Sequence, residues 1–123
     1  MSATGRQTDG FWEYLHRLLD DSRLVIDRPK HSRHPRFPEV VYPLDYGFLE
    51  GTTAADGGGI DVWVGSQGQR PLSGVICTVD LQKRDTEVKI LLGCTQEEAG
   101  TILDFHNENG MRAIWIPCPK ERR

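Results

Sequence analysis

The chain has 123 residues, which is enough for one modest hydrophobic core and too short for two domains. A hydrophobic fraction of 37% and a charged fraction of 27% exclude an intrinsically disordered protein. The formal net charge of −3 gives no indication of nucleic-acid binding, and no apolar run approaches the length of a membrane span. We therefore expect one globular domain over residues 1–123.

The N-terminus and the cysteines indicate a cytoplasmic protein. The first residues, MSATGRQTDGFWEYLHR, lack the basic start and apolar stretch of a secretory signal. Three cysteines, Cys77, Cys94 and Cys118, lie far apart, and their odd number argues against a disulfide framework. We predict reduced thiols, with Cys77 and Cys94 in the core because both lie in apolar runs.

Two helices are predicted, one near each end of the chain. The first lies within residues 1–22 and begins after Asp9, a plausible N-cap. In residues 95–110, Thr95 followed by Glu98 is the pattern of a capping box. The apolar face of the first helix is predicted from residues at helical spacing: Phe11, Tyr14, Leu15, Leu18 and Leu19.

Short β-rich runs between these helices predict about six strands. A basic loop at 28–39 contains three prolines, and Pro43 interrupts the second run. The polar residues 83–85 separate the fourth and fifth runs, which predicts a hairpin. The predicted strands lie within residues 23–27, 40–48, 60–64, 74–82, 86–93 and 112–117.

The order of these elements predicts an α+β fold. Strands and helices do not alternate regularly, so a mainly antiparallel sheet or small barrel with helices packed outside is favoured. We expect an N-terminal helix in residues 1–22, the barrel and late helix in residues 24–116, and a tail at 117–123.

The stretch AADGGGIDVWV, residues 54–64, contains the first candidate functional residues. Asp56 lies on a glycine-rich turn, and Asp61 is second in the strand that follows. On that strand Val62 would point away from Asp61 and Trp63. The two carboxylates could converge on a hard cation such as Mg²⁺. The alternative is a plain acidic turn, because aspartate and glycine are the commonest turn formers.

A second acidic group occurs in RDTEVKI. Asp85, Glu87 and Lys89 are spaced two apart, so all three project from one face of a strand. A solvated face of alternating charges is one interpretation. If the face is an inner one, its two carboxylates and its ammonium must be paired with one another or bound to metal.

The third group is basic and lies in the proline-rich loop. Guanidinium and ammonium groups on such a loop bind anions, most often phosphate. A solvated basic loop, or a weak nucleic-acid contact, is the alternative interpretation. Carboxylates for Mg²⁺ together with nearby cations are what a phosphate-rich substrate requires. The loop residues concerned are Arg28, Lys30, Arg33, His34 and Arg36.

The segment YPLDYGFLEGTTAADGGGIDVWV, residues 42–64, resembles the central segment of soluble family I inorganic pyrophosphatases. In that family Tyr-Pro and Asn-Tyr-Gly-aromatic elements lead to Asp-x-Asp-Pro-x-Asp and a hydrophobic strand. The later DTEVK is similar to a family strand that carries acidic groups and a lysine. The resemblance covers roughly residues 24–116. It implies an OB-like β-barrel with flanking helices and Mg²⁺-dependent hydrolysis of pyrophosphate, with Mn²⁺ as a possible substitute.

The resemblance also implies roles for individual residues. The metal ligands it implies are Asp56, Asp61, Asp85, Glu87 and Asp27. The substrate-binding residues are Lys30, Arg36, Arg33, His34, Tyr46 and Lys89. Of all these, Asp61, Tyr46 and Lys89 are the implied catalytic residues.

The chain departs from the family pattern at several points. Gly58 and Gly59 replace the middle aspartate and the proline of the signature. That aspartate is a leading candidate in the family for activating the attacking water. His106 and Asn107 stand where the family has a Tyr-Lys pair, and an N-terminal hairpin of the family has no counterpart.

These observations leave three interpretations of function. The first is a divergent pyrophosphatase of low activity, and the second is a hydrolase of an organic pyrophosphate or nucleotide. The third is a phosphate- or nucleotide-binding module that has lost turnover. All three predict a small phosphorylated partner rather than nucleic acid or a membrane, and a homo-oligomer is compatible with the sequence.

Overall fold

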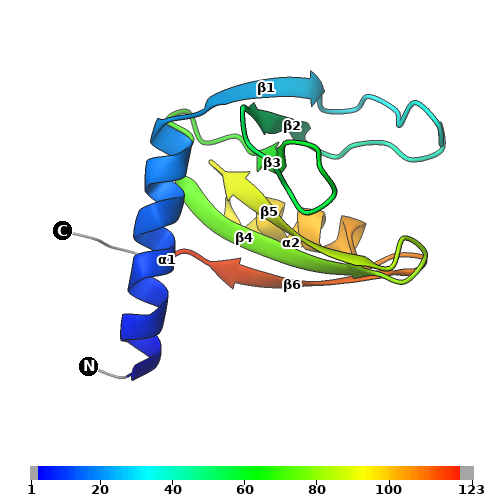
Figure 1. The fold of residues 1–123 in the computed structure, drawn as a ribbon. Coiled ribbons are helices and arrows are strands. Elements are labelled where there is room, and N and C mark those ends of the chain that lie inside the picture. Colours follow the sequence, from blue (N-terminus) through cyan, green and yellow to red (C-terminus); the bar gives the residue numbers. More distant parts are fainter. Residues whose placement is uncertain (1–2, 120–123) are drawn as a thin grey trace.

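The computed structural model describes residues 3–119, with side chains from Asp9 onward (Figure 1). Part of the predicted tail, residues 120–123, lies outside the described residues. Within the described range the predicted order of helices and strands is confirmed. The elements are α1 (Ala3–Asp20), β1 (Arg23–Arg28), β2 (Asp45–Glu50), β3 (Ile60–Val64), β4 (Leu72–Asp80), β5 (Asp85–Leu92), α2 (Gln96–Phe105) and β6 (Met111–Pro117).

The strands form one sheet in the order β1-β2-β3-β5-β4-β6. Neighbouring strands pair in antiparallel fashion except β3 and β5, which are parallel. The predicted α+β, mainly antiparallel class and the β4–β5 hairpin are confirmed. In the described residues β1 and β6 are edges, so the sheet is not a closed barrel. Each face of the sheet packs against a helix, which leaves neither face to close on itself.

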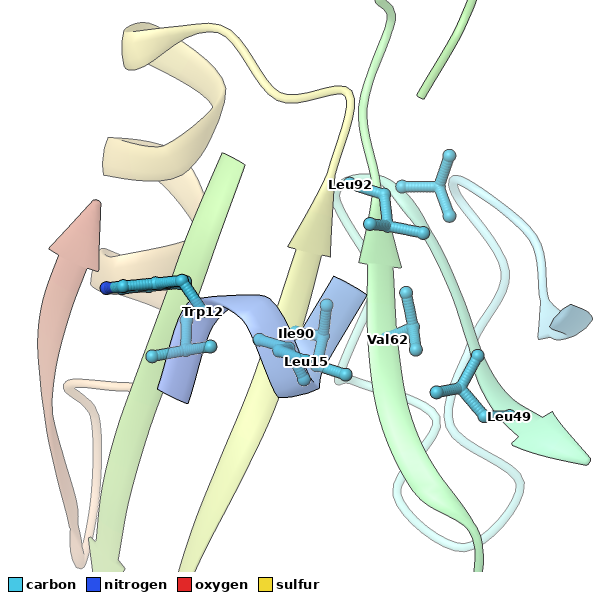
Figure 2. Packing of buried hydrophobic residues seen from close by; sticks show 8 residues of the cluster. Trp12, Leu15, Leu49, Val62, Ile90 and Leu92 are labelled. Atoms are coloured by element: carbon cyan, nitrogen blue, oxygen red, sulfur yellow. The ribbon is translucent and has the colours of Figure 1, made fainter. Parts of the chain in front are cut away.

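Helix α1 covers one face of the sheet (Figure 1). Trp12 and Leu15 are buried against Leu49, Val62 and Ile90 (Figure 2). Burying side chains of this size is worth roughly 1.5–3 kcal/mol each. No helix within residues 3–119 has the length and apolar character needed to cross a bilayer.

The buried face of α1 differs from the predicted one. Phe11 and Tyr14 are 48% and 68% exposed, whereas Trp12, absent from the prediction, is buried. Trp12 and Leu15 are three residues apart and lie on one side of the helix, which turns the neighbouring rings toward solvent.

The predicted N-terminal cap of α2 is confirmed, and the predicted start of α1 is wrong. Thr95 and Glu98 form both hydrogen bonds of the predicted capping box. Helix α1, however, begins at Ala3, so Asp9 lies inside the helix and is not its N-cap. The preceding residues contain no proline, so helical hydrogen bonding continues upstream.

A second core lies on the other face of the sheet, beneath α2 (Figure 1). Trp63 and Leu91 are fully buried there with Ile76, Ala99 and Ile102. Trp63 therefore faces α2, whereas Val62, the preceding residue of β3, faces α1. This alternation is the one that the two-residue period of a strand predicts.

The pairing of β1 with β2 is unusually close. A Cβ atom at Gly47 would lie 1.9 Å from the carbonyl oxygen of Val25, so only glycine fits this position. The register then shifts between Ile26 and Arg28, which leaves Asp27 in an irregularity of the strand. Such bulges redirect side chains, and Asp27 and Arg28 both line the cavity described below.

Candidate active site

A cavity of about 620 Å³ lies on the α2 side of the sheet. Strands β2, β3 and β5 supply one wall. The rest of the lining comes from the end of β1, the loop between β1 and β2, the turn at Asp56, the end of β4 with the turn after it, and residues 105–111. The cavity therefore joins segments that are far apart in the sequence.

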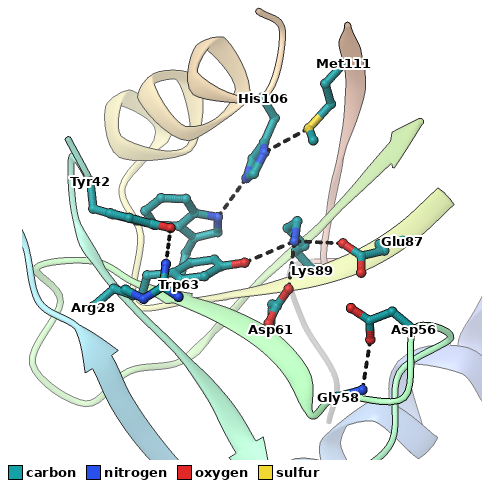
Figure 3. Close-up of polar contacts among 11 residues, drawn as sticks. Arg28, Tyr42, Asp56, Gly58, Asp61, Trp63, Glu87, Lys89, His106 and Met111 are labelled. Carbon is teal, nitrogen blue, oxygen red and sulfur yellow. Dashed lines mark hydrogen bonds and ion pairs between the residues drawn. The ribbon is translucent and has the colours of Figure 1, made fainter. Parts of the chain in front are cut away.

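Lys89 is the centre of the wall formed by the strands. Its Nζ donates hydrogen bonds to Oδ2 of Asp61 at 2.8 Å, to Oε1 of Glu87 at 3.0 Å and to the hydroxyl of Tyr46 at 3.0 Å (Figure 3). The Lys89 side chain is 6% exposed, that of Glu87 10% and that of Asp61 29%. A lysine ammonium has three donors, so all are committed to this cluster, and a phosphate would have to displace one of them.

The environment keeps Lys89 charged and Tyr46 neutral. Burial alone would lower the pKa of Lys89, but the charge of Asp61 and the hydrogen bonds to Asp61 and Tyr46 outweigh burial and raise that pKa above its ordinary value. Burial also raises the pKa of the Tyr46 phenol. At neutral pH the cluster therefore contains an ammonium, a neutral phenol and the two acidic side chains.

The position of Asp56 agrees with both interpretations of its sequence, the acidic turn and the functional site. Its Oδ1 accepts a hydrogen bond from the backbone N–H of Gly58 at 3.0 Å, which is the main cause of its lowered pKa. Gly57, between Asp56 and Gly58 in the turn, has a φ of 91°, a backbone conformation that favours glycine. Asp56 thus stabilises its turn and also lines the cavity.

A buried chain of hydrogen bonds lies behind the Lys89 cluster. The indole N–H of Trp63 donates to Nε2 of His106 at 3.0 Å, and Nδ1 of His106 lies 3.4 Å from the sulfur of Met111 (Figure 3). Burial, with the positive charge of Lys89, lowers the pKa of His106 to about 3. The imidazole is therefore neutral and carries its proton on Nδ1, because Nε2 accepts.

The loop between β1 and β2 forms the opposite wall. Arg28 donates from Nη1 to the hydroxyl of Tyr42 at 2.5 Å. Nδ1 of His34 accepts from the backbone N–H groups of Arg36 and Phe37, at 3.0 and 3.3 Å. Burial and the charge of Arg28 lower the pKa of His34. These bonds give a proline-rich loop a defined shape.

The cavity is negatively charged overall. Its permanently charged cations are Arg28, Lys83 and Lys89. Its carboxylates outnumber them and are Asp27, Glu39, Asp56, Asp61, Asp80, Glu87 and Glu108. A phosphate would be repelled unless other cations entered with it.

The structure brings many of the predicted site residues together. Those that line the cavity are Asp27, His34, Tyr46, Asp56, Asp61, Glu87 and Lys89. Lys30, Arg33, Arg36 and Asp85 are not among the lining residues. Arg33 donates to the carbonyl oxygen of Pro38 at 2.8 Å, and Asp85 begins β5 opposite Asp80.

Several cavity residues were missing from the predicted site. Arg28 was noted only as part of the basic loop, and Tyr42 only as the start of a motif. Trp63 does not line the cavity, but it donates to His106, which does; it shares a strand face with Asp61, so its side of the sheet was predictable. His106 was noted only as a departure from the family's Tyr-Lys pair, and its bond to Trp63, 43 residues away in the sequence, has no local signal.

The carboxylates fit a divalent cation by their chemistry. Asp56, Asp61 and Glu87 offer the oxygen ligands that Mg²⁺ prefers. The hydrogen bonds to Lys89 use one oxygen each from Asp61 and Glu87. Among residues 3–119, however, no three His, Cys, Asp or Glu side chains are already grouped closely enough to hold a metal ion. A coordination shell is thus not preformed in the described chain.

Comparison with known proteins relates the fold to one enzyme. The structure is similar to that of an inorganic pyrophosphatase from the pathogenic bacterium Helicobacter pylori, with a TM-score of 0.54 and 20% sequence identity. The match covers 79% of this chain and 83% of the pyrophosphatase chain. No protein-family model and no curated protein matches the sequence. The similarity is therefore one of fold.

Proposed function

We propose that this chain hydrolyses phosphoanhydrides, most directly inorganic pyrophosphate. The observation that carries the proposal is the buried Lys89 ammonium, which holds Asp61, Glu87 and Tyr46 at the wall of a 620 Å³ cavity. The similar fold of an inorganic pyrophosphatase supports the same reaction. The DYG and AADGGGID motifs supply residues on this wall.

A divalent cation is part of the proposal. Mg²⁺, or Mn²⁺ in its place, would be held by Asp56, Asp61 and Glu87, with Asp27 as a further ligand. Such a cation neutralises phosphate charge and lowers the pKa of a bound water. The excess of carboxylates in the cavity supports this requirement, since pyrophosphate is itself an anion.

The side chains of the chain would then act as follows. Water attacks one phosphorus, the bond from that phosphorus to the bridging oxygen breaks, and two orthophosphates form. Asp61, the most exposed carboxylate of the Lys89 cluster, accepts the proton of the water. Lys89 holds Asp61 and Glu87 in position and keeps a positive charge beside the departing phosphate.

The proposal predicts that pyrophosphate is hydrolysed only with a divalent cation present. Orthophosphate release should appear with Mg²⁺ or Mn²⁺ and should stop when a chelator removes the metal. The full chain is used, and its folding is checked by circular dichroism. Absence of release at every cation concentration would refute the hydrolase proposal.

Cation binding is predicted to depend on Asp61. Titration calorimetry with Mn²⁺ should show binding to wild type, and Asp61→Asn should weaken it at least tenfold because one anionic ligand is lost. Glu97→Gln, an exposed change in α2 outside the cavity, is the matched control. Equal affinity of wild type and Asp61→Asn would remove the proposed metal site.

Gly58 favours a second candidate, a phosphate-binding module without turnover. Position 58 carries no side chain where the pyrophosphatase signature has its middle aspartate. Binding of pyrophosphate with Mg²⁺ but no release of orthophosphate would identify this function.

A further inference from the structure

The cavity is larger than a pair of linked phosphates requires. Cavities of about 300–1,000 Å³ enclose drug-sized ligands, and this one has about 620 Å³. The Lys89 cluster occupies only the wall formed by β2, β3 and β5. The opposite wall and the far end of the cavity take no part in the hydrolysis described above.

A row of rings leads from the Lys89 cluster to the opposite wall of the cavity. Nζ of Lys89 lies 5.6 Å from the centre of the Tyr46 ring, which is 5.2 Å from the Tyr42 ring. The Tyr42 and His34 rings are nearly parallel, at 11° and 6.4 Å, and His34 is 5.1 Å from Phe37. All five residues line the cavity.

The row ends in an exposed ring that the loop holds in place. Phe37 is 52% exposed. Its backbone N–H donates to His34, and its carbonyl oxygen accepts from Val40 at 2.8 Å. An aromatic side chain that is half open to solvent at a cavity wall presents a face on which a planar ring can stack.

We infer that the substrate is an organic diphosphate that carries an aromatic ring, such as a nucleoside diphosphate. This inference rests on the proposed hydrolase function. The diphosphate lies toward Lys89 and Asp61, and the ring stacks at Phe37 and His34. Gln82, Glu108 and Asn109 also line the cavity and offer amide and carboxylate groups to polar atoms of the ring.

The reaction balances without a further reactant. The oxygen of a water molecule forms a bond to the terminal phosphorus, and the bond between that phosphorus and the bridging oxygen breaks. The bridging oxygen stays with the nucleoside monophosphate, the terminal group leaves as orthophosphate, and the proton of the water passes to solvent by way of Asp61.

The decisive experiment compares four compounds with Mg²⁺, namely pyrophosphate and three organic diphosphates. Orthophosphate release is measured from pyrophosphate, from adenosine and uridine diphosphates, and from butyl diphosphate, which has an organic group without a ring. We expect kcat/KM for at least one nucleoside diphosphate to exceed that for butyl diphosphate at least tenfold. Phe37→Ala should remove most of this preference, because stacking on an aromatic side chain contributes about tenfold or more.

Tyr14→Ala removes a ring on α1 that is even more exposed than Phe37, at 68% against 52%, and is the matched control. It should leave the preference intact. Hydrolysis of pyrophosphate with no preference for a ring, or a preference that survives Phe37→Ala, overturns this inference and leaves the proposed function standing.

If no substrate is hydrolysed, calorimetry decides the ligand class separately. Tighter binding of adenosine or uridine diphosphate than of butyl diphosphate, lost in Phe37→Ala, would support the aromatic ligand and contradict hydrolysis. Equal binding of all three compounds would overturn both proposals.

Discussion

At the scale of single residues, Lys89 determines the state of the site. Its ammonium is buried and has both Asp61 and Glu87 within 3.0 Å. Two carboxylates this close would repel each other without a cation between them. The lysine therefore makes it possible to hold two acidic groups together at a cavity wall by protein contacts alone.

Removing this ammonium should destabilise the fold. Lys89→Met leaves the partly buried carboxylates without their partner, and breaking a buried pair in this way costs about 3–5 kcal/mol. Urea unfolding at pH 7 measures the loss. Arg23→Met is the control, because the Arg23–Glu50 pair is exposed, with side chains 74% and 55% accessible. That control should change the free energy of unfolding by less than about 1 kcal/mol. Similar losses in both variants would contradict the role given to Lys89.

At the scale of elements, the turn at 54–59 and the segment after α2 complete the site. In this turn the backbone conformation at position 57 requires glycine, and that at position 58 does not. Gly57 has a φ of 91°, whereas a Cβ at Gly58 would meet only Oδ1 of Asp56, at an ordinary 3.5 Å. Position 58 is therefore open to a side chain, and position 57 is strained by one.

Introducing an aspartate at position 58 should increase hydrolysis. A positioned base contributes about 10²–10⁴-fold, so Gly58→Asp should release orthophosphate from pyrophosphate faster than wild type does. Gly57→Asp is the matched control and should lower the free energy of unfolding without raising activity. High wild-type activity that Gly58→Asp fails to increase would mean that another group already serves as the base.

The segment after α2 predicts a pH dependence of stability. His106 has a pKa of about 3 when folded and about 6.5 when unfolded. Between these two pH values the unfolded chain binds more protons than the folded chain. The contribution of His106 to the free energy of unfolding is therefore fully present above pH 6.5 and is lost as the pH falls toward 3.

Unfolding by urea at pH 7 and pH 4 measures this loss. The loss of unfolding free energy between pH 7 and pH 4 should be up to about 3 kcal/mol larger in wild type than in His106→Gln. Glutamine keeps an acceptor for Trp63 but does not titrate. The carboxylates titrate in both proteins, so their contribution cancels in the comparison. An equal loss in both proteins would contradict a buried imidazole with a lowered pKa at position 106.

At the scale of the whole molecule, local patterns predicted the elements, and long-range packing decided the rest. The two-residue period of β3 correctly separated Asp61 and Trp63 from Val62. The parallel pairing of β3 with β5 has no local signature, and neither does the 43-residue separation of Trp63 from His106.

Lys89 was predicted to share a strand face with Glu87, and in the structure its ammonium contacts Glu87 and also Asp61 of β3. The sequence could not show that Lys89 would use all three of its donors on protein groups, because this depends on where Tyr46 and Asp61 meet it in the folded sheet. A cytoplasmic location and a possible homo-oligomer stay predictions.

The most direct test of the central claim compares wild type with Asp61→Asn in orthophosphate release from pyrophosphate with saturating Mg²⁺. Asparagine keeps the shape of the side chain but neither accepts the proton nor balances Lys89. We predict that wild type releases orthophosphate and that Asp61→Asn, folded by circular dichroism, loses about 10²–10⁴-fold in kcat. Full activity in Asp61→Asn, or none in wild type, would contradict the assignment of this cavity as a phosphoanhydride hydrolase site.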